Sequence, residues 1–286
     1  MRKVAIITDS TCCLPSELVE KYDICLVPIF VVYKGESYRD GIDISPGEVY
    51  KIMRRRKDLP TTSTPSAGDF LEVYRRLSQE AESILCITLT GLQSKTFEAA
   101  VVAKERANEV IPDTAIEVVD SRAVAGALGF VVLEAARVAS QGAELPQVAN
   151  AARSMISRVS LLAMLDTLYY LARTGRIAKA AAWAGSVLNM KPVLGHSTSI
   201  GETTPVARPR TKAKALKLMV KLMAERVGDS TVHVIVHHAD ELEEGEKLKA
   251  EIGSRFSCAE LYLTEFTPGM GVHAGPGILG FSFYVD

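Results

Sequence analysis

The amino-acid sequence predicts an α/β protein with two domains. In its first half, short apolar runs alternate with segments of helical periodicity, a pattern typical of a mostly parallel sheet with helices on both faces. From about residue 155 the composition and spacing of these segments change. We therefore predict an N-terminal α/β domain over residues 1–155 and a smaller α/β C-terminal domain over residues 156–286.

The N-terminal half contains three apolar runs that we expect to be strands: VAIIT (4–8), SILCITL (83–89) and AIEVV (115–119). Helices are expected to open near Pro15-Ser16, to span about 45–54, to begin after Ser66 and near Ser94, and to span 125–139. Ser66 stands three positions before Asp69, which is the spacing of a capping box. A turn-rich stretch that resembles a hairpin, residues 25–45, lies between the first two helices.

The C-terminal half has a different order of elements. Two segments rich in Ala and Leu, 161–172 and 178–188, are expected to be helical, and a Gly- and Thr-rich stretch follows at 195–207. The expected remainder is a basic helix (211–226), the strand VHVIV (232–236), a charged helix (241–253) and strands near 259–264 and 278–284. This order predicts a second α/β unit with its own topology.

The charge balance argues against a nucleic-acid partner or a membrane-surface role. The chain has 33 basic and 34 acidic side chains and a net charge of −1, whereas such partners select a basic excess. The apolar runs are too short to cross a bilayer, so no stable membrane insertion is expected. The five cysteines include no C-x-x-C pair and are interpreted as thiols in a reducing compartment, which predicts a cytoplasmic protein.

Polar segments follow several of the predicted strands. TDST (8–11) and TGLQS (90–94) come directly after two of them, and PTTSTPS (60–66) precedes a helix. The carboxyl ends of parallel strands and the helix N-termini beside them form the ligand-binding edge of an open sheet, and they favour an anion. Ordinary helix capping explains each segment taken alone; several on one edge favour a binding site.

The stretch GMGVHAGPG (269–277) does not match a nucleotide-binding loop. Its glycines follow the spacing G-x-G-x-x-x-G, one residue longer than the dinucleotide fingerprint, and no strand, turn and helix follow it. We expect a flexible turn before the last strand, because glycine adopts positive φ angles readily. Such a turn does not by itself require His273.

A catalytic alternative remains open, whereas a metal-binding one is not favoured. Ser94, His273 and an aspartate such as Asp120 would form a hydrolase triad if they converged, although the chain lacks the G-x-S-x-G motif. His233 and His237 share one face of a predicted strand and suggest a metal site. Without an H-E-x-x-H motif or an evident third ligand, we expect no metal.

Seven short motifs occur in an order that resembles the DegV family of bacterial fatty-acid-binding proteins. They are TDST (8–11), YRDGIDIS (38–45), TTSTPS (61–66), SKTF (94–97), TGRIAK (174–179), LNMKPVL (188–194) and HAGPG (273–277). Together they span nearly the whole chain.

The resemblance implies a carrier rather than an enzyme. A long-chain fatty acid such as palmitate, stearate or oleate would lie between the two domains with its carboxylate buried, and a separate fatty acid kinase would convert it to an acyl-phosphate. The residues that correspond to the family's head-group ligands are Thr62, Ser94, His273 and Arg210. No cofactor is implied.

The resemblance has local departures. Thr64, Gly91, Gln93 and Lys95 stand where the family usually has glutamine, serine, leucine and glycine. Lys95 either adds a cation near the head group or limits the approach of the backbone to the ligand. The sequence therefore leaves the preferred acyl length and unsaturation undefined, together with the identity of the kinase and the oligomeric state.

Overall fold

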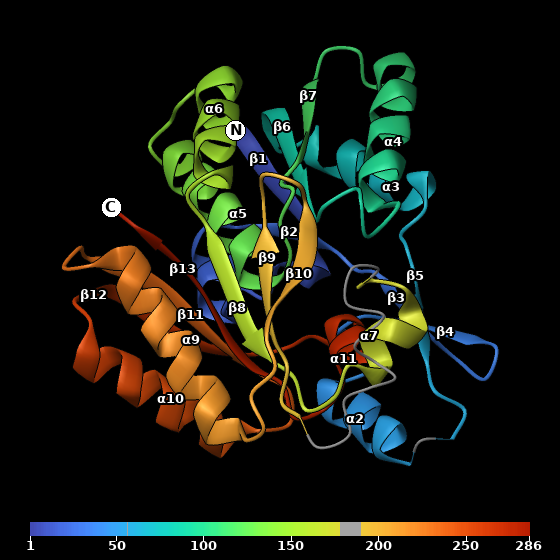
Figure 1. The fold of residues 1–286 in the computed structure, drawn as a ribbon. Helices are drawn as coiled ribbons and strands as arrows, with labels where there is room; N and C mark the ends of the chain where they lie inside the picture. Colours follow the sequence, from blue (N-terminus) through green and yellow to red (C-terminus); the bar gives the residue numbers. More distant parts are fainter. Residues whose placement is uncertain (56, 178–189) are drawn as a thin grey trace.

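The computed structural model of the chain describes residues 1–55, 57–177 and 190–286 and contains three sheets (Figure 1). The first sheet is entirely parallel and has the strand order β2-β1-β6-β7. Its strands are β1 (Arg2–Asp9), β2 (Cys25–Val27), β6 (Ala81–Thr88) and β7 (Ala115–Asp120). The predicted mostly parallel sheet is thus confirmed.

Helices cover both faces of the first sheet. One face packs against α3 (Ala67–Leu77) and α4 (Thr96–Val110), the other against α5 (Ala125–Ser140) and α6 (Leu145–Ile156). Neighbouring strand residues therefore face different cores: Ile7 packs toward α3 and α4, and Ile6 toward α5 and α6. The alternation of apolar side chains on two buried faces explains the continuous apolar runs in the sequence. The short helix α1 (Ser16–Lys21) follows β1.

The second sheet has six strands in the order β10-β9-β8-β13-β11-β12, and only β11 and β12 run parallel. Its strands are β8 (Ser160–Met164), β9 (Val193–Ser197), β10 (Glu202–Ala207), β11 (Val232–His238), β12 (Cys258–Glu265) and β13 (Leu279–Val285). Two helices, α9 (Lys212–Val227) and α10 (Leu242–Arg255), pack on one face. On the other face, α5 contacts β8 and β13, so this helix lies between the first two sheets.

A third, antiparallel sheet has the order β4-β3-β5 and lies beside a group of three further helices (Figure 1). It consists of β3 (Phe30–Tyr33), β4 (Glu36–Arg39) and β5 (Thr61–Ser63), and the helices are α2 (Pro46–Arg54), α7 (Tyr169–Thr174) and α11 (Pro268–Ala274). Helix α11 contacts α2, α7, β3 and β5. A segment near the C-terminus therefore packs against elements from the first quarter of the chain.

One prediction for the C-terminal half is wrong. The run 161–172 is not one helix, because its first residues form β8 and only its end forms α7. Strand β8 pairs with β9 and β13 on its two sides, and a short apolar run buried in a sheet has no periodicity that separates it from a buried helix. The Gly- and Thr-rich stretch contains most of the β9–β10 hairpin. The helix predicted at 178–188 lies outside the described residues.

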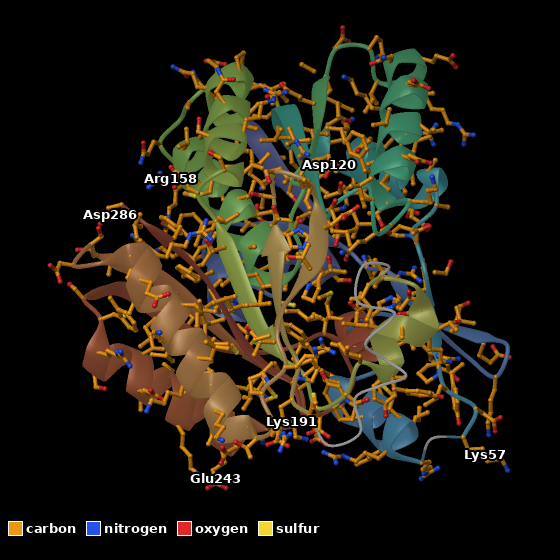
Figure 2. All side chains as sticks on the ribbon, in the orientation of Figure 1. Lys57, Asp120, Arg158, Lys191, Glu243 and Asp286 are labelled. Atoms are coloured by element: carbon orange, nitrogen blue, oxygen red, sulfur yellow. The ribbon has the colours of Figure 1, made fainter. Side chains whose placement is uncertain are left out.

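The hydrophobic core crosses the predicted domain boundary. All strands of the first sheet precede residue 155 and all strands of the second follow it, yet one core cluster extends from Val4 to Tyr284. Charged side chains such as Lys57 and Glu243 project from the periphery (Figure 2). The division into domains 1–155 and 156–286 stays a prediction. In the part of the chain that the structure describes, no helix has both the length and the apolar character needed to span a bilayer.

Candidate functional site

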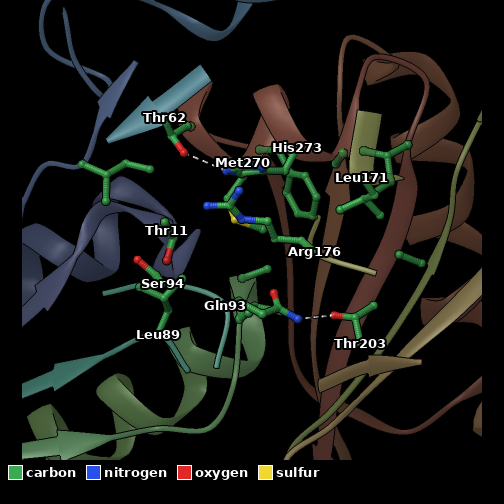
Figure 3. A pocket seen from close by; sticks show the side chains of 18 of the residues that line it. Thr11, Thr62, Leu89, Gln93, Ser94, Leu171, Arg176, Thr203, Met270 and His273 are labelled. Carbon is green, nitrogen blue, oxygen red and sulfur yellow. Dashed lines mark hydrogen bonds between the residues drawn. The ribbon is translucent and has the colours of Figure 1, made fainter. Parts of the chain in front are cut away.

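A mostly apolar cavity lies where the three sheets and α11 meet (Figure 3). Its apolar wall includes Leu89 after β6, Leu161 of β8, Leu194 of β9 and Met270 of α11. Its polar lining residues are Thr11, Thr62, Ser63, Thr64, Gln93, Ser94, Arg176, Thr203 and His273. The cavity thus combines hydroxyl groups and one guanidinium with an extended hydrocarbon surface.

Thr62 and His273 form the direct link between distant parts of the site. Thr62 Oγ1 in β5 lies 2.8 Å from His273 Nε2 in α11 (Figure 3). Burial, followed by the nearby charge of Arg176, lowers the pKa of His273 to about 3, so its imidazole is neutral at pH 7. His273 Nδ1 is buried and has no hydrogen-bond partner among the described residues.

The segment that carries His273 is a short helix rather than the predicted flexible turn. Residues Pro268–Ala274 form α11, with Pro268 in the first turn. Two of its glycines allow close packing: a Cβ on Gly271 would lie 2.7 Å from Tyr50 Cε1, and one on Gly269 would lie 2.3 Å from Ile29 Cδ1. The positive φ angles expected of the glycines occur only after the helix, with φ +82° at Gly275 and +89° at Gly277.

Buried polar contacts fix α11 in place. Gly269 donates its backbone N–H to Asp40 Oδ1 at 2.7 Å, and Ser10 Oγ donates to Asp40 Oδ2 at 2.6 Å. The hydroxyl of Tyr50 donates to the carbonyl oxygen of Phe266 at 3.1 Å. These hydrogen bonds satisfy buried polar groups of α11 and of the N-terminal residues that pack against it. The N-terminal half of the chain therefore sets the position of His273.

Ser94 lies at the start of α4, as the sequence predicts. Its Oγ is 2.8 Å from Thr96 Oγ1 and accepts the backbone N–H of Thr96 at 3.3 Å. Helix α4 begins at Thr96, with Lys95 at its N-cap. Ser94 therefore presents its hydroxyl to the cavity beside a helix N-terminus, where an anion is favoured.

The residues of the hypothetical hydrolase triad are not connected. Among the described residues, the hydrogen-bond partner of His273 is Thr62 rather than Ser94. The carboxylate of Asp120 accepts the backbone N–H groups of Gly91 and Arg122. A nucleophilic serine needs a hydrogen bond to its base, and the base needs an orienting group. Neither contact is present in the part of the chain that the structure describes.

The arginine at the cavity is Arg176 and not Arg210. Arg176 lines the cavity, and its Nη1 donates to the backbone oxygen of Thr174. Within residues 1–55, 57–177 and 190–286, no carboxylate forms an ion pair with it. Arg210 lies just before α9, is exposed and does not line the cavity, so the structure does not bring it to Thr62, Ser94 and His273.

Two other sequence features take positions away from the cavity. Lys95 is exposed and pairs with Glu98 at 2.6 Å, so its charge is directed toward solvent and not toward the cavity. His233 contacts Glu260 and Asp286, whereas His237 contacts Thr264 and Ser282. No cluster of three metal-ligating side chains occurs in the described ranges.

Sequence reasoning missed Arg176 and Thr11 as cavity residues. Arg176 belongs to the motif TGRIAK and Thr11 to TDST, and the sequence resemblance assigns neither side chain a role. Thr11 Oγ1 donates to the buried carboxylate of Asp9. Each motif contains polar side chains that could have indicated a cavity residue. The local sequence does not show which of these side chains points into the cavity.

Comparison with known proteins identifies close relatives. A family model described as an uncharacterised protein of the DegV family matches residues 3–286. A DegV domain-containing protein of Streptomyces coelicolor is 35% identical over 281 residues, which cover 98% of this chain and 97% of that protein.

Two solved structures are similar over essentially their full length. A fatty-acid-binding DegV family protein from Thermus thermophilus superposes with a TM-score of 0.91, at 30% identity and with 100% of both chains covered. A stearic acid-binding protein from Eubacterium ventriosum superposes with a TM-score of 0.89, at 28% identity and with 100% of this chain and 98% of the other covered.

Proposed function

This chain belongs to the DegV family, and we propose that it binds a long-chain fatty acid in the cavity described above. The carboxylate would contact Thr62 and Ser94, with His273 and Arg176 beside it. The acyl chain would extend along the apolar wall. Relatives described as fatty-acid-binding proteins support this proposal at full-length similarity.

The observation that carries the proposal is the combination of the Thr62–His273 pair with an apolar cavity. A carboxylate removed from water is costly unless donors surround it, and hydroxyl groups, a helix N-terminus and a guanidinium are such donors. The hydrocarbon tail gains about 0.8 kcal/mol for each buried CH₂ group. The cavity therefore offers hydrogen-bond donors for the carboxylate of a fatty acid and an apolar surface for its hydrocarbon tail.

The proposed role is that of a cytoplasmic carrier that presents the fatty acid to a separate ATP-dependent kinase. In this role the chain does not perform the chemistry itself. The separation of Ser94 from His273 supports a binding function, because neither residue is activated for nucleophilic attack. The neutral state of His273 agrees with this, since its low pKa makes it a weak base.

Mass spectrometry of lipid extracted from the purified protein is the first test. We expect a long-chain fatty acid to copurify, or to bind on incubation with a dissociation constant that can be measured. A protein that neither carries nor takes up any fatty acid would contradict the proposal.

A second assay separates the carrier from a hydrolase. The isolated chain should show no turnover of esters or ATP, and Ser94→Ala should weaken fatty acid binding. Ester hydrolysis that is abolished by Ser94→Ala would establish the hydrolase instead. If a fatty acid kinase forms acyl-phosphate only when this chain is present, the result would support the proposed presentation of the fatty acid to the kinase.

A further inference from the structure

A chain of hydrogen bonds leads from the cavity to the edge of the second sheet. Gln93 Nε2 donates to Thr203 Oγ1 at 3.0 Å (Figure 3), and Thr203 Oγ1 lies 3.1 Å from His196 Nδ1. His196 Nε2 in turn lies 2.9 Å from the backbone oxygen of Arg122. Thr203 and His196 are directly opposite each other in the β9–β10 pair.

The direction of every bond in this chain can be assigned. The carbonyl oxygen of Arg122 only accepts, so His196 Nε2 carries the proton. Burial lowers the pKa of His196, which keeps the ring neutral and makes Nδ1 an acceptor for the Thr203 hydroxyl proton. Thr203 Oγ1 then accepts from Gln93, which places the amide nitrogen of Gln93 toward Thr203. The orientation of this amide thus follows from its partners.

The consequence is a fixed acceptor at the cavity. Gln93 lines the cavity, and its Oε1 has no hydrogen-bond partner among the described residues. In Figure 3 the oxygen is turned away from Thr203, toward the side of the cavity where Arg176 lies. Gln93 also precedes Ser94, which is proposed to contact the carboxylate, so the acceptor lies close to the head-group region.

An unsubstituted saturated chain does not satisfy this acceptor. An alkyl segment against Gln93 Oε1 would remove water from the carbonyl and offer no donor in return, which costs free energy. A carboxylate is also an acceptor and would be repelled. A hydroxyl group on the acyl chain would donate to this oxygen.

Resting on the proposed function, we infer that Gln93 is a specificity-determining residue that selects fatty acids with a hydroxyl group near the carboxyl end. Thr203 is a positioning residue, because its bond to Gln93 holds the amide with Oε1 directed into the cavity. His196 fixes Thr203 in the donor orientation that this arrangement needs.

The test compares dissociation constants of delipidated protein for hexadecanoate, 3-hydroxyhexadecanoate and 16-hydroxyhexadecanoate. One neutral hydrogen bond corresponds to a preference of about 3- to 10-fold, so the wild-type chain should bind the 3-hydroxy acid more tightly than hexadecanoate by that factor. Gln93→Leu should abolish the preference while still binding hexadecanoate. Thr203→Val should reduce it, because the amide is then free to turn.

The 16-hydroxy acid and the variant Lys95→Ala serve as controls. The first places its hydroxyl at the far end of the chain, and the second changes an exposed residue that does not line the cavity. The 16-hydroxy acid should show no preference that depends on Gln93, whereas Lys95→Ala should keep the wild-type preference for the 3-hydroxy acid. Equal affinity of the wild type for hexadecanoate and its 3-hydroxy derivative, or an unchanged ratio in Gln93→Leu, would overturn the inference and leave the proposed function intact. Failure to bind any of the three acids would overturn both.

Discussion

Thr62 Oγ1 and His273 Nε2 lie 2.8 Å apart although 211 positions separate the two residues in the sequence. The pair connects β5 of the small antiparallel sheet with α11, which leads into the central strand β13 of the second sheet. The contact therefore exists only when both halves of the chain are folded against each other. This dependence makes the pair a sensitive place to test the proposed binding site.

Replacement of Thr62 by valine should weaken fatty acid binding by about 10-fold or more. Valine keeps nearly the same shape and removes one donor to a charged group, for which about 1.5–3 kcal/mol is a typical contribution. The measurement is a dissociation constant for hexadecanoate. Thr61→Val provides the matched control, because Thr61 lies in the same strand, is exposed and does not line the cavity. Equal losses in both variants would remove Thr62 from the proposed site.

Substitution of Arg176 or of Arg210 by glutamine should affect fatty acid affinity differently. Arg176→Gln should reduce affinity for hexadecanoate by about 10-fold or more, because it removes the guanidinium that lines the cavity. Arg210→Gln should leave the affinity nearly unchanged, since Arg210 is exposed and outside the cavity lining. Binding titrations of the two variants side by side decide between them. A large loss in Arg210→Gln alone would restore the assignment suggested by sequence resemblance.

The packing of α11 predicts a difference between two glycine-to-alanine changes. Gly271→Ala should destabilise the protein by about 1–3 kcal/mol, because the new Cβ would press against the ring of Tyr50, a fully buried residue. Gly47→Ala in α2 should be neutral or stabilising by up to about 1 kcal/mol, since a Cβ there meets no atom within 4 Å. Urea denaturation of both variants measures the difference. Similar behaviour of the two would contradict the close packing described for α11.

His237 should make stability depend on pH in the acidic range. Burial, followed by the charge of His238, lowers its pKa from 6.5 to about 3 in the folded protein. The unfolded chain therefore takes up a proton below about pH 6.5 that the folded chain does not, and stability falls as the pH decreases toward 3. The contribution approaches about 1.4 kcal/mol per pH unit within this window.

The comparison needed is wild type against His237→Gln, with urea midpoints measured between pH 7.5 and pH 4.5. The variant should lose less stability on acidification, because the titrating imidazole is gone while the other histidines remain. Above about pH 7 the two slopes should agree. A parallel decline of both proteins across the whole range would show that His237 does not contribute.

The alternation of strands and helices in the first half was predictable because each apolar run is bounded by polar caps and turns. Ser66, for example, forms the capping box with Asp69 that its spacing indicates. The second half was harder, because β8 is short, apolar and buried within a sheet. Such a run lacks the alternation that identifies an exposed strand, and its Leu and Ala residues favour helix.

The site was predictable only in part. Polar segments before two predicted helices indicated the regions of Thr62 and Ser94, and the family resemblance named these two residues. The glycines around His273 suggested a turn, because glycine adopts positive φ angles readily and is a poor helix former. Tertiary packing overrides that preference, since only small residues fit between α11 and Tyr50. Whether Arg176 or Arg210 reaches the cavity depends on how distant strands pair. Local sequence carries no information about that arrangement.

The core that extends across both halves of the chain has a thermodynamic consequence. A molecule that occupies the cavity contacts β5, the segment between β6 and α4, β8 and α11 together, so its binding free energy adds to the unfolding free energy of the entire chain. By mass action, a ligand at 100 times its dissociation constant raises that free energy by about 2.7 kcal/mol. The melting temperature of this protein should therefore report the fraction of molecules that carry a lipid, and delipidated and loaded samples should melt as distinct populations.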